Sequence, residues 1–215
     1  MSKLYFYYGA MGSSKSLRLL TTAYNFEEKG IDFLCFKSSI DTRDGDGIIK
    51  SRIGVQRECV KIEPSDNLFK IISDSISNNQ HIKKILIDES QFLTKRQVEQ
   101  LGHVVDTFDI DVMCYGLRTD FRTELFEGSK RLLELADTIE EVKSHCSCGR
   151  KAIINARFTS DGDIVLHGNQ VEIGGNDRYK PLCRKCYQEE CDKLCYKMVD
   201  EYTKFQETNK DKNNK

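Results

Sequence analysis

The first sixteen residues constrain the fold most strongly. An aromatic, strand-like run from Leu4 to Tyr8 leads into a loop that reads Gly9-Ala10-Met11-Gly12-Ser13-Ser14-Lys15-Ser16, and a helical apolar pattern follows. This is the order and spacing of a phosphate-binding loop, with Ser14 in place of the usual second glycine. Successive backbone N–H groups of such a loop wrap phosphates, and the helix N-terminus adds positive potential.

Two side chains of this loop have specific expected roles. Lys15 is expected to reach the β- and γ-phosphates of a nucleotide, and Ser16 to place its hydroxyl on Mg²⁺. The competing interpretation is a turn of small residues in which Ser13 or Ser14 caps the next helix. We favour the phosphate site, because strand, loop, lysine, hydroxyl and helix follow in the required order.

The chain up to about residue 142 alternates apolar strand-like runs with helical patterns. Besides Leu4–Tyr8, the expected strands are 32–37, 84–88, 111–116 and 138–142, and the expected helices are 16–29, 94–108 and 129–136. This alternation predicts an α/β fold with a parallel sheet covered by helices on both faces. Ligands of such sheets bind at the carboxyl ends of the strands, where we expect Lys15, Asp41, Asp88 and Arg118 to converge.

A carboxylate pair, Asp88 and Glu89, ends the apolar strand Ile85-Leu86-Ile87. Asp88 is suited to hold Mg²⁺, and Glu89 to accept a proton from an attacking hydroxyl. Asp41 and Arg43 follow an earlier strand, where Arg43 can offer a planar fork to phosphate. A solvated Asp/Gly-rich turn explains this second pair equally well from residue types alone.

Bulk composition narrows the class of protein. The 215 residues carry 33 basic and 34 acidic side chains, so no global basic field favours nucleic-acid binding. Neither a secretory signal nor an apolar run of the roughly 20 residues needed to span a bilayer is recognisable, which predicts a cytoplasmic protein without a membrane partner.

Cysteines crowd the last third of the chain, at Cys146 and Cys148, at Cys183 and Cys186, and at Cys191 and Cys195. In a reducing compartment, the first two pairs favour a closed, structural, tetrahedral Zn²⁺ site over disulfides. Such a site would tie together both ends of a Gly-rich segment in which Ile164–Leu166 and Gln170–Ile173 are candidate short strands. For Cys191 and Cys195 packing is the safer interpretation. A charged helix is expected from about residue 187 to Thr208, followed by a polar, disordered end.

Together these motifs resemble the zinc-containing, P-loop type of thymidine kinase, most closely its bacterial branch. The resemblance extends to about Tyr187 and rests on runs such as Tyr5–Tyr8, Asp88–Thr94, Cys114–Arg122 and Gly174–Tyr179. It implies a RecA-like P-loop domain over residues 1–143, a small zinc-ribbon-like domain with a lasso loop over 144–190, and a C-terminal helix and tail over 191–215. Ser14 departs from the family pattern and puts nucleotide affinity or rate in question.

The resemblance also implies an activity and a set of site residues. The activity is ATP-dependent phosphorylation of the 5′-hydroxyl of deoxythymidine to dTMP with Mg²⁺, by a homotetramer that dTTP inhibits. Glu89 matches the catalytic base, and Ser16 and Asp88 match the magnesium site. The ATP site comprises Gly9–Ser16 with Asp88, Glu89, Ser90 and Gln91. The nucleoside site comprises Met11, Asp41, Arg43, Phe92, Leu117, Phe121, Phe126, Val171, Ile173, Gly174, Gly175 and Tyr179.

Three other interpretations stay open on the sequence. One is a different P-loop ATPase that hydrolyses ATP without a nucleoside, and another is a thymidine kinase homologue weakened by Ser14. The third is a zinc-ribbon module that binds nucleic acid through a basic face made of Arg150, Lys151, Arg157, Arg178, Lys180, Arg184 and Lys185. Solubility or contacts with nucleotide phosphates explain that basic cluster more simply.

Overall fold

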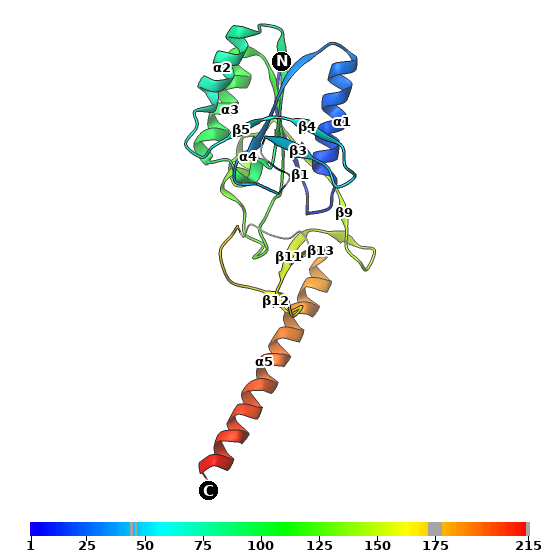
Figure 1. The fold of residues 1–215 in the computed structure, drawn as a ribbon, viewed down its shortest axis with the longest axis vertical. Coiled ribbons are helices and arrows are strands. Elements are labelled where there is room, and N and C mark those ends of the chain that lie inside the picture. The colour runs from blue at the N-terminus through cyan, green and yellow to red at the C-terminus, as the bar shows by residue number, and fades with distance from the viewer. Residues whose placement is uncertain (44, 46, 172–177, 214–215) are drawn as a thin grey trace.

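The centre of the molecule is a six-stranded, entirely parallel sheet (Figure 1). The computed structural model describes residues 1–215 except 44, 46, 172–177 and 214–215, and the side chains of 206–213. The strand order is β5-β2-β6-β7-β1-β8. These strands are β1 (Leu4–Tyr8), β2 (Asp32–Ser38), β5 (Val60–Ile62), β6 (Ile82–Asp88), β7 (Asp111–Gly116) and β8 (Thr138–Glu141).

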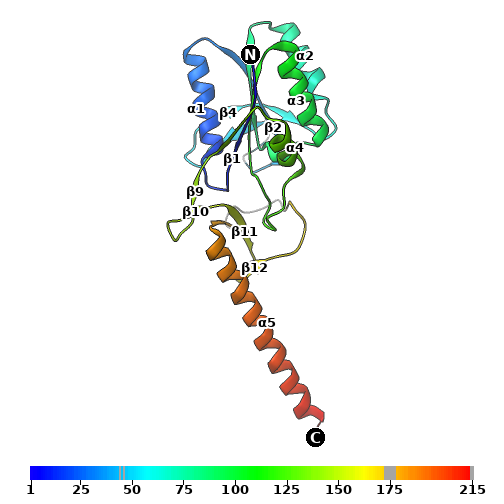
Figure 2. The same cartoon turned by 180° about the vertical axis from the view of Figure 1, so that it is seen from behind.

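Helices cover both faces of this sheet, as the alternation of strands and helices predicts. Figures 1 and 2 show α1 (Lys15–Glu28) on one face, and α2 (Leu68–Asn78), α3 (Lys95–Phe108) and α4 (Glu127–Leu135) on the other. Neighbouring strand residues divide between two cores. Leu86 packs in the cluster with Leu19 of α1, whereas Ile85 and Ile87 belong to the cluster with α2, α3 and α4. This follows from the period of two along a strand.

The strand order brings the predicted site residues to one edge of the sheet. β7 lies between β1, which leads into the phosphate loop, and β6, which ends at Asp88. Because all these strands are parallel, their carboxyl ends lie at the same edge. A crevice for ligands is expected there.

A smaller β region follows the main sheet and precedes a long helix. It consists of the two-stranded sheet β9 (Ser144–His145) with β10 (Lys151–Ala152), and the antiparallel sheet of β12 (Ile164–Val165), β11 (Ile154–Phe158) and β13 (Tyr179–Leu182). The long segment between the cysteine pairs therefore contains a small antiparallel sheet. It packs its own apolar cluster, which includes Cys146, Phe158 and Leu182.

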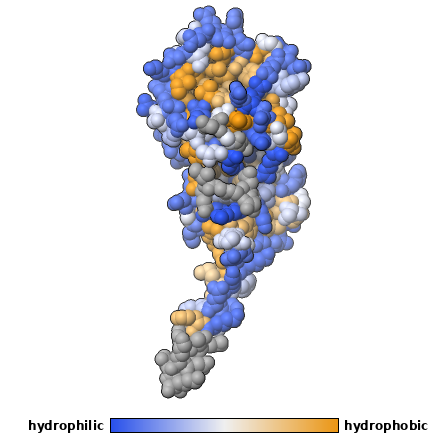
Figure 3. Space-filling view, in the orientation of Figure 1, coloured by the Kyte–Doolittle hydropathy of each residue, from blue (hydrophilic) through white to orange (hydrophobic). Residues whose placement is uncertain are grey.

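The last helix, α5 (Arg184–Asn213), projects from the body (Figures 1 and 2). Its described side chains, up to residue 205, are mostly hydrophilic in Figure 3, although Tyr196, Met198, Val199, Tyr202 and Phe205 are exposed among them. The helix predicted to run to about Thr208 thus continues to Asn213, and disorder of the polar end stays a prediction. Within the described part of the chain, no helix combines the length and apolar character needed to cross a membrane.

The expected strands and helices of the main sheet are confirmed to within one or two residues at each end. Sequence reasoning missed α2, whose N-cap Asn67 accepts a hydrogen bond from the Lys70 N–H. It also missed the short strands β3 (Ile48–Lys50), β4 (Gln56–Glu58) and β5, which have only three residues each. The proposed strand at Gln170–Ile173 is wrong at Gln170 and Val171, which lie outside any strand. Its last two residues are outside the described part.

Candidate active site

The phosphate loop joins β1 to α1, and its backbone explains the departure at Ser14. Ser14 has φ 62° and ψ 29°, in the left-handed region, and its side chain makes no capping hydrogen bond. A side chain with a Cβ is disfavoured there by about 1–2 kcal/mol, which is why glycine is usual at this point. Ser14 therefore keeps the glycine-type conformation of the loop at the expense of backbone strain.

Lys15 is folded into the loop. Its Nζ donates to the carbonyl oxygens of Gly9 and Ala10 at 3.2 and 2.9 Å and to Ser13 Oγ at 3.1 Å. Burial lowers the pKa of Lys15 to about 8, although the nearby carboxylates of Glu89 and Asp88 act in the opposite direction. All three N–H donors of the ammonium group are thus taken up by the loop itself, so a bound phosphate would have to replace one of these acceptors.

Asp88 is buried at the end of β6, with 3% of its surface exposed. Burial and the neighbouring charge of Glu89 raise its pKa to about 7, whereas a hydrogen bond with Ser16 acts to lower it. The two residues predicted to hold Mg²⁺ are therefore neighbours at this end of the sheet. A hydroxyl beside a carboxylate supplies the oxygen ligands that Mg²⁺ prefers.

Glu89 is fixed by partners on both carboxylate oxygens. Arg43 Nη2 donates to Oε1 at 2.8 Å, and Gln91 Nε2 donates to Oε2 at 2.5 Å. Glu89 itself has φ 52°, a second strained backbone position in the site. Such outliers persist where surrounding contacts fix them, and they cluster at functional sites.

Arg43 is oriented in turn by Asp41. Its Nε and Nη2 donate to the two Asp41 oxygens at 2.5 and 3.1 Å. Burial acts to raise the pKa of Asp41, but Arg43 and Lys37 outweigh it and hold the pKa below its usual value. From the sequence, a phosphate-binding role and a solvated turn explained residues 41–43 equally well. In the structure these residues form an ion-pair network that reaches Glu89.

One pocket, of about 380 Å³, opens over the phosphate loop. Gly12, Ser14, Lys15 and Ser16 line one side of it. The other side is a segment that sequence reasoning missed, comprising Lys50, Ser51, Arg52 and Ile53. Lys50 and Arg52 of this segment belong to no recognisable sequence motif. The β3–β4 hairpin brings them to the pocket.

A second, more apolar pocket of about 90 Å³ adjoins the first. Its lining includes these residues predicted for the nucleoside site: Met11, Asp41, Arg43, Phe92, Leu117, Phe121, Phe126, Val171 and Tyr179. Phe92 and Phe126 meet edge to face, with ring centroids 5.7 Å apart. The remaining predicted residues, Ile173, Gly174 and Gly175, lie outside the described part of the chain. The lining residues that sequence reasoning did not identify are Ile40, Thr119, Asp120, Asn155 and Gln170.

Three other residues that the sequence analysis named have particular surroundings. Arg118 stacks over the Tyr8 ring at 5.7 Å and lines neither of these two pockets. Ser90 is fully buried, and a Cβ on Gly116 would come within 2.7 Å of its Oγ. Arg157, counted in the basic face of the nucleic-acid interpretation, is 5% exposed and stacks 3.8 Å from the Phe121 ring centroid. It is therefore unavailable to a surface ligand.

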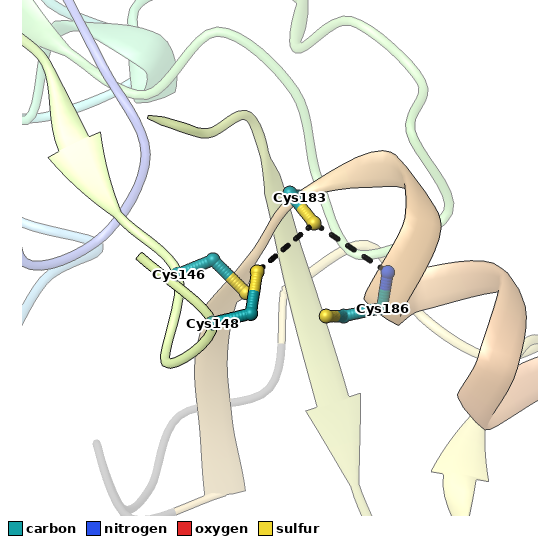
Figure 4. A group of neighbouring side chains, drawn as sticks. All are labelled: Cys146, Cys148, Cys183 and Cys186. Atoms are coloured by element: carbon teal, nitrogen blue, oxygen red, sulfur yellow. Dashed lines mark hydrogen bonds between the residues drawn. The ribbon is translucent and has the colours of Figure 1, made fainter. Parts of the chain in front are cut away.

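The four cysteines of the predicted zinc site converge from the β9–β10 turn and the start of α5 (Figure 4). Their Sγ atoms all lie within 4.8 Å of one another, and Cys148 Sγ is 3.6 Å from Cys183 Sγ. Tetrahedral Zn–S bonds of about 2.3 Å place sulfurs about 3.8 Å apart, so the quartet has the dimensions of a closed zinc site. Cys191 packs in the small apolar cluster, and Cys195 is exposed.

The chain matches a known protein family over most of its length. The family model described as thymidine kinase matches residues 2–187. The chain is 46% identical over 188 residues to a thymidine kinase of Coxiella burnetii, covering 87% of this chain and 96% of that protein. It is 48% identical over 198 residues to a thymidine kinase of Zymomonas mobilis, covering 90% of this chain and all of that protein (100%).

Among solved structures, a Pif1 helicase from Candida albicans superposes with a TM-score of 0.42 at 13% identity. That match covers 66% of this chain and 36% of the helicase. A likeness this low carries no conclusion about function.

The strain at Ser14 predicts that Ser14→Gly stabilises the protein. Glycine adopts the left-handed conformation freely, so the substitution relieves the backbone strain. After the entropic cost of glycine in the unfolded chain is subtracted, the free energy of unfolding in urea should rise by about 0.5–1 kcal/mol. The control is Ser65→Gly, at an exposed turn serine whose φ is not positive, which should lose about 0.5 kcal/mol. Equal effects of the two substitutions would contradict this account.

The burial of Asp88 predicts that the folded protein, measured without ligands, loses stability as the pH rises. The folded-state pKa of about 7 lies above the ordinary value of 3.8, so folded protein retains a proton that unfolded protein releases between these values. Stability therefore falls as pH rises from about 4 to 7. Asp88→Asn should raise Tm at pH 8, by roughly 2–4 °C per kcal/mol recovered, with little effect near pH 4.

Asp74→Asn, at an exposed position on α2, controls for the loss of one negative charge. Melting curves of both variants and wild type between pH 4 and 8 provide the measurement. An Asp88→Asn difference that stays constant over this range would contradict the prediction.

Proposed function

Because this chain belongs to the thymidine kinase family, we propose that it transfers the γ-phosphoryl group of ATP to the 5′-hydroxyl of deoxythymidine, giving dTMP. The observation that carries the proposal is the junction of the two pockets. Met11, Arg43, Glu89 and Leu117 line both the phosphate-loop pocket and the apolar pocket. A donor in one pocket and an acceptor in the other would meet beside the Arg43–Glu89 pair.

We assign the donor site to the phosphate loop. Its backbone N–H groups and the start of α1 wrap the phosphates, and Lys15 contacts the β- and γ-phosphates. Ser16 and Asp88 hold Mg²⁺, which when bound neutralises charge on the phosphate oxygens. The cations of Lys50 and Arg52 on the facing hairpin raise the positive potential of the same pocket. ATP contacts for Ser90 and Gln91 stay predictions.

The apolar pocket is the proposed acceptor site. Aromatic rings from Phe92, Phe121 and Phe126 supply flat surfaces for a planar base, and Met11 and Leu117 supply an apolar niche for its 5-methyl group. The predicted gripping segment continues from Val171 into residues outside the described part, and Tyr179 closes the lining from β13. Exclusion of water here would limit wasteful hydrolysis of ATP.

Glu89 is the proposed general base. The hydrogen bonds from Arg43 and Gln91 fix the direction of its carboxylate, so that it can take the proton of the 5′-hydroxyl as the oxygen attacks phosphorus. Arg43 is placed to stabilise charge on the transferred group as well. Transfer then requires mainly positioning and charge neutralisation, which these residues provide.

A structural Zn²⁺ held by Cys146, Cys148, Cys183 and Cys186 is also proposed. It would connect the β9–β10 turn to the junction between β13 and α5, and so hold together a region with a small core of its own. Three units, residues 1–143, 144–190 and 191–215, follow as the proposed division of the chain. Assembly as a homotetramer and feedback binding of dTTP stay predictions.

The kinase proposal is tested with radiolabelled thymidine and a parallel assay of ATP consumption. Wild-type protein should consume ATP only when thymidine is present. Glu89→Gln keeps the size of the side chain but removes the base, and should lower kcat by roughly 10²–10⁴-fold. Glu58→Gln, at an exposed strand position, should leave kcat unchanged. ATP consumption that does not depend on thymidine would sink the proposal.

Metal analysis of purified protein should find about one zinc per chain. Cys183→Ala should lose the metal and lower Tm, because the remaining thiolates no longer close a tetrahedral site. Cys195→Ser, at an exposed cysteine outside the quartet, should retain both zinc and Tm. A chain that is folded but free of metal would remove the zinc assignment.

A further inference from the structure

Met11 of the phosphate loop is held by two polar side chains from the small β region. Its backbone N–H donates to Asn155 Oδ1 at 2.7 Å, and its carbonyl oxygen accepts from Ser144 Oγ at 3.2 Å. Both side chains are buried, with 3% of Asn155 and 6% of Ser144 exposed. Polar groups of the zinc-bearing region thus take up both backbone hydrogen-bonding groups of one loop residue.

The other end of the Asn155 amide contacts a different part of the site. Its Nδ2 donates to the carbonyl oxygen of Thr119 at 2.9 Å. Thr119 follows β7 in the segment that carries Leu117 and Phe121 of the apolar pocket. Only a side chain with an acceptor and a donor on one planar group can make both bonds, so aspartate or leucine could not replace it fully.

The phosphate loop also packs closely against the same region. A Cβ on Gly9 would lie 2.3 Å from the carbonyl oxygen of Val142, so this position has no room for a side chain. A Cβ on Gly12 would make only ordinary van der Waals contacts, with Arg52 Nη1 at 3.7 Å, Ser144 Oγ at 3.8 Å and Pro181 Cγ at 4.0 Å. The chain just before the first cysteine pair therefore leaves no room for a side chain at the start of the loop.

The cysteine quartet holds the strands that present these groups. Ser144 lies in β9, two residues before Cys146, and pairs with Ala152 of β10. Asn155 pairs with Pro181 of β13, whose strand ends next to Cys183. A change in the geometry of the quartet would therefore move Ser144 and Asn155 relative to the main sheet.

We propose that Asn155, assisted by Ser144, is a positioning residue that couples the zinc-held β region to the phosphate loop and fixes Met11 as the wall between the two pockets. Met11 lines both pockets, so its displacement alters the donor and the acceptor site together. The contact between Asn155 and the loop stands on the hydrogen bonds, and the effect of zinc on it rests on the proposed metal site. Its effect on turnover rests on the proposed kinase function.

Amide hydrogen exchange of the segment around Met11, measured without substrates, tests the coupling directly. In zinc-loaded Asn155→Ala, the Met11 amide loses its buried acceptor and should exchange roughly 10- to 100-fold faster than in wild type. Asn25→Ala, at an exposed position of α1, should leave this exchange unchanged. Removing zinc by chelation should accelerate exchange in wild type, and add little in Asn155→Ala.

Asn155→Asp separates the two hydrogen bonds, since it keeps an acceptor for Met11 and loses the donor to Thr119. It should largely retain Met11 protection. If thymidine is the substrate, Asn155→Ala should raise KM for both ATP and thymidine and lower kcat, whereas Asn155→Asp should raise mainly KM for thymidine. If wild-type protein does not phosphorylate thymidine but Asn155→Ala still accelerates exchange of the Met11 amide, the kinase function is overturned and the coupling stands.

Unchanged Met11 exchange in a folded, zinc-loaded Asn155→Ala protein would overturn the proposal. Equal acceleration at all amides would do so too, because it would indicate general destabilisation. If Asn155→Ala does not fold, Asn155→Leu keeps most of the side-chain volume, removes both hydrogen bonds and gives the same measurement on the Met11 amide. A several-fold acceleration confined to residues 9–12 would support the coupling, and its absence would contradict it.

Discussion

The burial of the Asp88 carboxylate at the carboxyl edge of the sheet is the constraint around which the site is organised. A buried carboxylate is costly unless hydrogen bonds or opposite charges compensate it. Here the Ser16 hydroxyl and the Lys15 ammonium supply partial compensation, and the pKa of Asp88 still rises to about 7. A bound Mg²⁺ would stabilise the ionised carboxylate further. Burial of Asp88 therefore favours binding of the cation that the proposed reaction requires.

The same edge carries backbone strain at two neighbouring points. Ser14 and Glu89 both have positive φ, and they lie in loops that face each other across the phosphate pocket. Each conformation orients a functional group, namely the loop N–H groups at Ser14 and the carboxylate at Glu89. The hydrogen bonds from Arg43 and Gln91 hold Glu89 in place, whereas Ser14 has no side-chain cap in compensation. This asymmetry explains why the loop at Ser14 is the better target for stabilisation.

Much of this organisation could be predicted from local patterns, and particular residues show the limit. The acid pair, the phosphate loop and the cysteine quartet are recognisable because each is a short run of residue types with a fixed spacing. Asn155, Thr119 and Arg52 were missed because a single neutral or basic residue has no such spacing. The basic face proposed from residues 150–185 is wrong at Arg157, because charge on the chain does not reveal whether a side chain stacks inward on Phe121.

The sequence by itself determined the parallel α/β sheet, the phosphate loop after its first strand, the carboxylates after another, and a four-cysteine cluster beyond them. These features follow from local periodicity and motif spacing, which the chain carries wherever it folds. Only the tertiary structure decided that Ser14 is left-handed, that Asp88 is buried, and that Asn155 holds Met11 from 144 residues away. Those outcomes depend on strand order and on packing between distant segments, and the hydrogen bonds exist only once both are set.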